Sequence, residues 1–391
     1  MSNYGLQKKF SQLATAIFLL IALSSFSALN ARNSVPRNLV ENAAIPEMDR
    51  VRIWGDIVPD QILKLLEERR HQISRAHRAI DKSQAFLILS GGGEDGAFGA
   101  GLLTGWSAQG NRPKFSIVTG VSTGALIAPF AFLGSQYDRQ LHEIYTQYGT
   151  NDLFAPQLLP ALITGASGDD NTPFADIIAR YVDRPLINAV AREHKKGRRL
   201  LVLTTNLDAQ RPVIWDMGRI ASSRHPNSLK LFRKVLQASA SFPGLFPPVK
   251  IQVRAGGKHY EEMHIDGGAS HNLFFAPIEV LQALSGASGS SRNHLYVLFH
   301  SKLTPEWKSV KQDAREIALR SISTLIKSHA NTDIINLHQD AIKIGIRFHL
   351  ASIPSKFNIE KTEPFDKVYM QKLFALGQKL GRKGFPRTEA P

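Results

Sequence analysis

The chain has 391 residues, of which 43% are hydrophobic, so it can bury a large core and is not an intrinsically disordered protein. It contains no cysteine, which excludes disulfides, thiol catalysis and cysteine-bound metal. The formal net charge of +15 predicts attraction to anionic partners. Nucleic acid is not the expected partner, because the basic residues are dispersed and no motif interleaves them with aromatic residues.

The first 27 residues have the pattern of a signal peptide. Lys8 and Lys9 precede the apolar run Leu13–Leu23, and small residues follow it. We expect cleavage after Ser27 and export to the periplasm or the medium. The run is short for a membrane span, which needs about 20 apolar residues, although extension to Leu29 would let it serve as an uncleaved anchor.

Beyond the signal peptide, the patterns predict two further parts. Residues 28–80 are expected to contain a polar linker and then a helix around 61–70. From residue 81 to 391, strand and helix patterns alternate, which predicts one α/β domain with a mostly parallel sheet and helices on both faces. Strand patterns occur at 85–89, 115–118, 199–205, 263–266 and 295–299, and helical patterns at 125–133, 229–239, 314–326 and 368–380. Residues 152–185 are predicted to form a surface loop, either a lid or a plain connection.

A glycine cluster follows the first apolar strand of this domain. Gly91, Gly93 and Gly96 match the dinucleotide-binding fingerprint G-x-G-x-x-G, but no Asp or Glu lies between residues 97 and 137 to hold a ribose. The second interpretation is an oxyanion hole, in which the backbone N–H groups of Gly91, Gly92 and Gly93 converge on a developing negative charge. The third is a tight turn without a ligand.

The run Gly120-Val121-Ser122-Thr123-Gly124 has the form G-x-S-x-G, with an apolar strand before it and a helical pattern after it. That arrangement is typical of a nucleophile elbow, which exposes a serine on a sharp turn at a helix N-terminus. A chance strand-to-helix turn would give the same letters. Ser122 is therefore a candidate nucleophile for acyl transfer.

Two later strands end in candidate partners for this serine. Asp266 ends the strand at 263–266 and precedes two glycines, a pattern that also occurs in ordinary turns. His264 lies on the same strand face as Asp266 and is expected either to tune Asp266 or to form a structural hydrogen bond. His300 ends the strand at 295–299, and Ser122, Asp266 and His300 follow the chain order of an α/β-hydrolase triad.

Together, in chain order, these motifs resemble those of the patatin-like phospholipases over about residues 85–270. The glycine loop at 91–96, G-x-S-x-G at 120–124 and Asp266-Gly267-Gly268 match, and residues 238–248 are similar to the A-S-x-A-x-P segment of the family. The resemblance implies a serine lipid acyl hydrolase with a patatin-like fold. Ser122 would be the nucleophile, Asp266 the base that takes its proton directly, and Gly91, Gly92 and Gly93 the oxyanion hole.

The same resemblance implies a lipid or ester substrate. For such an enzyme the net charge of +15 predicts peripheral contact with an anionic membrane surface, and without metal-ligand spacing in the sequence no cofactor is expected. An aspartate with its ordinary pKa of about 3.9 is a poor base for a serine hydroxyl, so the site should raise that pKa by burial. Asp95 departs from the family, which carries Arg or Lys there, and we expect its side chain to face solvent. The alternatives are a Ser-Asp-His esterase and a catalytically silent lipid-binding module.

Overall fold

The computed structural model describes residues 32–56, 60–75, 83–154, 172–275 and 292–386. The predicted signal peptide lies outside these residues, so its cleavage and the export that it implies stay predictions. Among the described helices, none is both long and apolar enough to cross a membrane.

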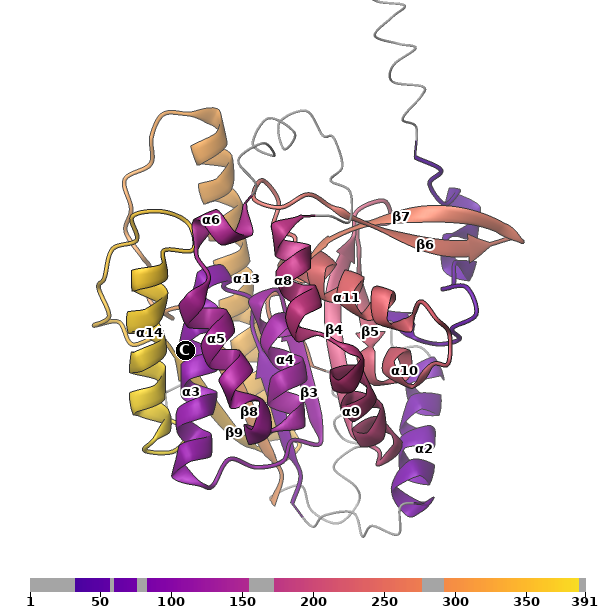
Figure 1. Ribbon diagram of the computed structural model, residues 1–391, viewed down its shortest axis with the longest axis horizontal. Coiled ribbons are helices and arrows are strands. Elements are labelled where there is room, and N and C mark those ends of the chain that lie inside the picture. Colours follow the sequence, from indigo (N-terminus) through magenta and orange to yellow (C-terminus); the bar gives the residue numbers. More distant parts are fainter. Residues whose placement is uncertain (1–31, 57–59, 76–82, 155–171, 276–291, 387–391) are drawn as a thin grey trace, which may run out of the picture.

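Within the described residues, a nine-stranded mixed sheet forms the centre of the molecule (Figure 1). Its middle is a run of parallel strands in the order β4 (Arg199–Asn206), β3 (Ile117–Val121), β2 (Ala85–Leu89), β8 (His294–Phe299) and β9 (Arg347–Ser352). β5 (Arg211–Asp216) pairs antiparallel with β4, and β1 (Arg52–Trp54) pairs antiparallel with β5 at the edge. β7 (Lys258–Asp266) also pairs antiparallel with β4 and forms a hairpin with β6 (Val249–Ala255). β2 and β3 are buried along their whole length, as parallel strands covered on both faces are.

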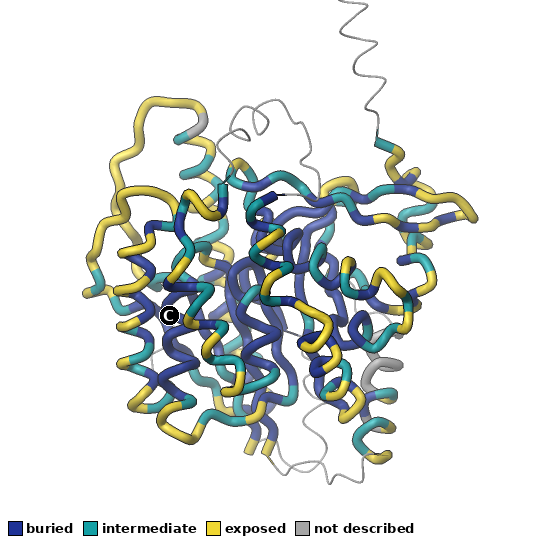
Figure 2. Tube along the Cα trace, viewed as in Figure 1, coloured by how far each residue is buried: buried dark blue, intermediate teal, exposed yellow. Residues whose placement is uncertain are grey.

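Helices cover both faces of the sheet, and Figure 2 shows the strands buried between them. Leu87 and Leu89 face the larger core, whereas Phe86 and Ile88 face the smaller one on the opposite side. The larger core is covered by α3 (Gly96–Gln109), α4 (Thr123–Leu133), α5 (Asp138–Gln147), α8 (Pro173–Tyr181), α9 (Arg184–Lys195), α10 (Met217–Ser222), α11 (Ser228–Ser239) and α14 (Lys367–Gly381). The smaller core is covered by α13 (Ala314–Lys343), through Ala330, Ile334 and Ala341. The predicted fold class is confirmed.

The remaining elements are short or peripheral. They are α2 (Asp60–Arg75), α6 (Thr150–Leu153) and the 3-10 helices η1 (Arg37–Asn42), η2 (Gly93–Asp95), η3 (Ser135–Tyr137) and η4 (Gly267–Ala269). Because β2, β3, β4 and β8 are parallel, their carboxyl ends lie at one edge of the sheet, where ligands bind in open α/β sheets. β7 runs antiparallel to β4 and pairs Asp266 with Thr204, so it ends at the same edge.

The structure differs from the predicted elements in three places. The expected polar linker contributes Ile45, Met48 and Val51 to the larger core, and β1 extends the sheet. The expected surface loop at 152–185 contains α6 and α8, and only its residues 155–171 lie outside the description. The helix expected at 314–326 continues to Lys343, because apolar residues at helical spacing pack its second half on the sheet.

Candidate active site

Ser122 lies on the sharp turn that joins β3 to α4. Its backbone has φ 55° and ψ −125°, a left-handed conformation that residues other than glycine rarely adopt. The turn packs closely on the neighbouring strand, because a Cβ atom on Gly124 would lie 2.4 Å from the carbonyl oxygen of Leu89. This geometry is that of a nucleophile elbow, and it places Ser122 at the N-terminus of α4, where the helix dipole favours negative charge.

The Ser122 hydroxyl donates a hydrogen bond to Asp266, with 2.6 Å between Oγ and Oδ2. The other carboxyl oxygen of Asp266 accepts a hydrogen bond of 2.7 Å from the Gly268 amide. Asp266 is buried, and burial raises its pKa to about 7, although these two hydrogen bonds oppose the rise. Near neutral pH, a carboxylate with such a pKa can accept a hydroxyl proton and return it.

The turn that follows α11 holds the backbones of both residues. The Ser239 hydroxyl accepts a hydrogen bond of 3.0 Å from the Ser122 amide and donates one of 2.7 Å to the carbonyl of Leu203. Two residues later, the Ser241 carbonyl accepts a hydrogen bond of 3.1 Å from the Asp266 amide. These serines belong to the stretch that resembles A-S-x-A-x-P, to which the sequence assigned no role. The signal that could have indicated a role was the position of this stretch in the chain, between the G-x-S-x-G motif and Asp266.

The glycine loop between β2 and α3 lines the same cavity as Ser122 and Asp266. A side chain at Gly92 is excluded, because its Cβ atom would lie 2.3 Å from the carbonyl oxygen of His300. The Gly91 amide donates a hydrogen bond of 3.1 Å to the carbonyl of Asn272, which the sequence did not predict. Among the described residues, the amides of Gly92 and Gly93 have no acceptor. The loop can therefore offer those two N–H groups to an oxygen atom in the cavity.

His300 lines the cavity but does not contact the Ser122–Asp266 pair among the described hydrogen bonds. Its Nδ1 donates a hydrogen bond of 2.6 Å to the Ser90 carbonyl, which assigns its tautomer and leaves the lone pair on Nε2. Burial lowers the pKa of His300 to about 4. The His300 amide also donates to the Ser90 hydroxyl, so His300 fixes the start of the glycine loop.

Asp95 does not face solvent as expected. Its side chain is 15% exposed, accepts a hydrogen bond of 2.7 Å from the Tyr369 hydroxyl and forms an ion pair of 3.0 Å with Lys361. Glu94 forms a second ion pair of 2.8 Å with the same lysine. Burial alone would lower the pKa of Lys361, but the carboxylates of Asp95 and Glu94 raise it above its ordinary value. The acidic charge of the loop is thus partly neutralised by a residue more than 250 positions further along the chain.

The cavity has a volume of about 660 Å³ and a largely apolar wall. α4, α5, α8 and the turn after α11 supply that wall, which includes Leu126, Phe130, Ile144, Phe174, Ile178, Leu236 and Phe246. The N-terminal half of α13 adds polar and basic side chains, among them Arg320 and Lys327. The residues that the sequence predicted to form a loop are therefore part of the wall, because Thr172 caps and Pro173 begins α8.

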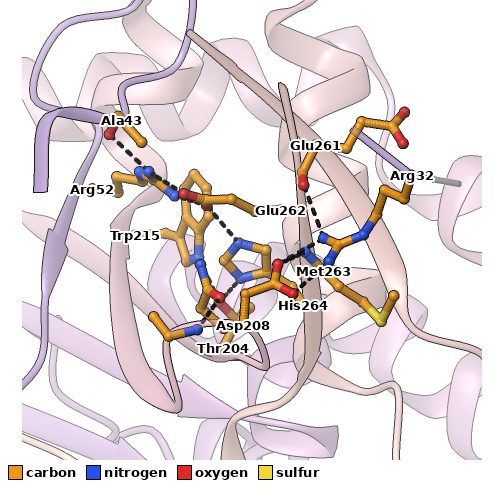
Figure 3. Close-up of polar contacts among 12 residues, drawn as sticks. Arg32, Ala43, Arg52, Thr204, Asp208, Trp215, Glu261, Glu262, Met263 and His264 are labelled. Atoms are coloured by element: carbon orange, nitrogen blue, oxygen red, sulfur yellow. Dashed lines mark hydrogen bonds and ion pairs between the residues drawn. The ribbon is translucent and has the colours of Figure 1, made fainter. Parts of the chain in front are cut away.

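His264 takes part in a buried hydrogen-bond chain next to Asp266 on β7 (Figure 3). Its Nε2 bonds Glu262 at 3.1 Å and its Nδ1 bonds the Thr204 hydroxyl at 2.9 Å, while Trp215 donates to that hydroxyl at 2.8 Å. The direction is set by the ionised Glu262, which can only accept, so His264 Nε2 donates to Glu262 and the Thr204 hydroxyl donates to Nδ1 of the neutral ring. Burial lowers the pKa of His264, which keeps it neutral. His264 does not touch the Asp266 carboxyl, so its contacts are structural.

Among the described residues, no group of three or more His, Cys, Asp or Glu side chains could hold a metal ion. The described cavity offers the hydroxyl of Ser122, the carboxyl of Asp266 and the amides of the glycine loop. These groups suit nucleophilic attack on a carbonyl carbon and stabilisation of the oxyanion that forms.

Comparison with known proteins assigns the chain to a family. A family model described as patatin-like phospholipase matches residues 87–281. Through this segment the chain belongs to the patatin-like phospholipase family. The patatin-like segment contains Ser122, Asp266 and the glycine loop, whereas His300 and Lys361 lie beyond it. As a family member, the chain is a hydrolase of lipid metabolism.

Solved structures are similar to the patatin-like chain only at low identity. VipD from Legionella pneumophila is 11% identical with a TM-score of 0.34, over 78% of this chain and 67% of VipD. Human GIVD cytosolic phospholipase A2 is also 11% identical with a TM-score of 0.34, over 72% of this chain and 52% of its own. The chain thus spans about half the length of the human protein. No curated protein sequence matches it.

Proposed function

We propose that this protein hydrolyses carboxylic esters of lipids with a Ser122–Asp266 dyad. The observation that carries the proposal is the hydrogen bond of 2.6 Å between the Ser122 hydroxyl and a buried carboxyl whose pKa is raised to about 7. The pair lies in a cavity whose apolar wall suits an acyl chain. An ordinary surface serine has neither a base within reach nor such a wall.

In the proposed mechanism, Ser122 Oγ bonds to the ester carbonyl carbon while its proton moves to Asp266 Oδ2. The carbonyl oxygen becomes an oxyanion and accepts hydrogen bonds from the Gly92 and Gly93 amides. When the intermediate collapses, the bond to the leaving alcohol breaks and Asp266 gives that alcohol its proton. Water then attacks the acyl-serine, Asp266 takes a proton from the water, and the fatty acid leaves with Ser122 restored.

Gly91 has a different part in this proposal from the one that the sequence predicted. Its amide is already bonded to the Asn272 carbonyl, so it anchors the loop and does not donate to the oxyanion. Removing one donor of this type costs about 2.7–4 kcal/mol of transition-state stabilisation in other hydrolases. The Gly92 and Gly93 amides would therefore supply a large part of the rate enhancement. His300, whose Nδ1 donates to the neighbouring Ser90 carbonyl, holds the loop in place.

The proposed substrates are lipids of an anionic membrane reached after export. Support comes from the net charge of +15 and from the signal-peptide pattern in the first 27 residues. Of the basic side chains on the cavity lining, Lys327 and Lys361 are paired with carboxylates, and Arg320 adds a further positive charge there. We propose no cofactor and no nucleic-acid partner.

Labelling by a fluorophosphonate probe, together with fatty-acid release from phospholipids, neutral glycerides and short p-nitrophenyl esters, tests the proposal. Wild-type protein should be labelled and active, and Ser122→Ala should abolish both. Ser135→Ala, at an exposed serine outside the cavity, is the matched control and should change neither. Folded wild-type protein that resists the probe and releases no fatty acid would instead indicate the silent lipid-binding module.

Asp266→Asn and His300→Gln separate the dyad from the Ser-Asp-His alternative. Asp266→Asn should lower kcat by about 10³- to 10⁴-fold, because the base is lost while the fold is kept. Glutamine at 300 can still donate to the Ser90 carbonyl, so His300→Gln should keep most of the activity. Equal losses in the two variants would replace the dyad with a triad.

A further inference from the structure

The segment that leads from β8 into α13 exposes a large aromatic side chain. Trp307 is 91% exposed, and residues 304–314 form a continuous exposed run, visible as the loop before α13 in Figure 2. Val310 and Ile317 add apolar side chains that are 37% and 50% exposed. An aromatic side chain so exposed, with apolar neighbours in the same segment, is typical of a surface that meets another phase or partner.

This segment is also the rim of the cavity that contains Ser122. Leu303, Pro305 and Glu306 line the cavity immediately before Trp307, and Arg320 lines it soon after Ile317. The rim is held in place, because the Arg320 guanidinium donates a hydrogen bond of 2.5 Å to the Glu306 carbonyl. Asp313 accepts a hydrogen bond of 3.0 Å from the Glu316 amide at the start of α13. Trp307 thus lies exposed at the cavity entrance, in a segment that these hydrogen bonds hold in place.

The charges of the rim leave two lysines beside the tryptophan without partners. Lys308 and Lys311 are exposed and form no ion pair with any described residue. The acidic neighbour Glu306 is neutralised, because it pairs with Lys327 at 2.9 Å and with Lys302 at 3.7 Å. The net charge beside Trp307 is therefore positive.

We propose that Trp307, Lys308, Val310, Lys311 and Ile317 form a docking face that binds an anionic lipid bilayer with the cavity entrance against it. The indole suits the boundary between headgroups and acyl chains, and each lysine near an anionic surface strengthens binding. A second copy of the chain is the weaker candidate, since it carries the same lysines and the same net charge of +15. The inference rests on the proposed lipid hydrolase function, because it explains how a bilayer lipid reaches Ser122.

The test measures vesicle binding with the full chain in the Ser122→Ala background, so that no lipid is consumed. Vesicles of phosphatidylcholine with phosphatidylglycerol are compared with vesicles of phosphatidylcholine alone. The chain has four tryptophans, of which Trp106 and Trp215 are buried and Trp54 is half-buried, so Trp307 dominates any change in fluorescence on binding. We expect a blue shift with the anionic vesicles and quenching by brominated acyl chains, and weaker co-sedimentation with these vesicles in Trp307→Ala and in Lys308→Gln.

Two isoleucines on α13 provide a matched pair. Ile317→Ala should weaken binding several-fold, whereas Ile342→Ala should not, because Ile342 is 65% exposed but about 40 Å further along the helix. Lys308→Gln and Lys311→Gln should each weaken binding to the anionic vesicles about five-fold. Equal behaviour of the two isoleucine variants, or no shift in Trp307 fluorescence, would overturn the docking face.

A second-copy interface would give a different result. In that case size-exclusion chromatography would show a dimer that Trp307→Ala converts to a monomer, and the lipid proposal would fail. The experiment also separates this inference from the proposed function. Failure of the docking face leaves hydrolysis of soluble esters intact, whereas failure of the Ser122–Asp266 chemistry leaves vesicle binding intact. If both proposals hold, Trp307→Ala lowers the rate on vesicles about ten-fold and leaves the rate on a soluble short-chain ester unchanged.

Discussion

Asp266 is a buried carboxyl whose proposed role as a base comes at the expense of stability. It lies at the end of β7 with 1% of its surface exposed, and it receives two hydrogen bonds, from Ser122 and from Gly268. No cation pairs with its carboxylate among the described ion pairs. Burial without a counter-charge disfavours the charged form, which is the physical reason for the raised pKa.

The raised pKa predicts the pH dependence of hydrolysis. Below about pH 7 Asp266 is protonated and cannot accept the Ser122 proton, so kcat/KM for a soluble ester should fall about tenfold per pH unit. Above pH 7 kcat/KM should reach a plateau. Steady-state rates between pH 5 and 9 check this. The fall in kcat/KM on the acid side should remain centred near pH 7 in His300→Gln. A fall centred near pH 4, where His300 titrates, would contradict the dyad.

The same shift predicts that Asp266→Asn stabilises the protein at alkaline pH. Because the folded-state pKa lies above the unfolded value, Asp266 favours the folded state below about pH 4, and this contribution is lost as pH rises through 7. The buried carboxylate then costs on the order of 4 kcal/mol at pH 8. Urea denaturation should show Asp266→Asn to be more stable than wild type at pH 8 and about equal near pH 4. A variant less stable at pH 8 would contradict this.

Among the elements, the turn after α11 has an effect beyond its own length. It connects to Ser122 through the Ser239 hydroxyl and to Asp266 through the Ser241 carbonyl. The Ser122 backbone is in a rarely adopted conformation, which persists only when surrounding contacts fix it. These contacts are therefore among those that hold Ser122 and Asp266 within hydrogen-bond distance of each other.

We expect Ser239→Ala to lower kcat by about ten- to a hundred-fold with little change in KM. The Ser122 amide would lose its acceptor, and the left-handed turn its support, while the cavity wall stays intact. Steady-state kinetics on a soluble ester measure the effect. Ser239→Thr keeps the hydroxyl and should restore part of the rate. A larger change in KM than in kcat would show that Ser239 acts on the wall instead.

Local patterns predicted the elements of the site better than the elements around it. The strands before Gly91 and Ser122 and the helices after them follow from short apolar runs and glycine spacing, which are local signals. The second half of α13 was missed although Ala330, Ile334 and Ala341 stand at helical spacing, because polar residues surround them in the chain. α8 was missed because its start, Thr172 and Pro173, was read as part of a polar loop, although Thr before Pro is also an N-cap signal.

Long-range contacts in the site were beyond the reach of the sequence. Asp95 was expected in solvent because nothing near it in the chain shows that Lys361 and Tyr369 pack against it. The Gly91 amide was expected in the oxyanion hole. Its hydrogen bond to the Asn272 carbonyl joins segments that are distant in the chain, so no local pattern indicates it. The pairing of Ser122 with Asp266 was also non-local, and it was predicted only because both motifs matched one family in the same order.

At the scale of the whole molecule, the N-terminal segment is tied to the strand that ends in Asp266. Arg52 on β1 pairs with Glu262 on β7 across 210 positions of the chain (Figure 3). Both side chains are less than 10% exposed. Burial alone would raise the pKa of Glu262, but hydrogen bonds from His264 and Arg52 lower it to about 2. This ion pair therefore joins β1, in the N-terminal segment, to the strand that carries Asp266.

This pairing predicts a strong coupling between the two positions. Arg52→Met should destabilise the fold by about 3–5 kcal/mol at pH 7, since it leaves Glu262 buried and charged, whereas Arg52→Met/Glu262→Gln should recover most of the loss. The lowered pKa of Glu262 stabilises the fold above about pH 4.5, and this contribution is lost as pH falls towards 2. The loss of stability in Arg52→Met should therefore become smaller in acid. Urea denaturation of the four proteins at pH 7 and pH 4 measures the cycle. Additive losses at both pH values would show that the N-terminal segment is independent of β7.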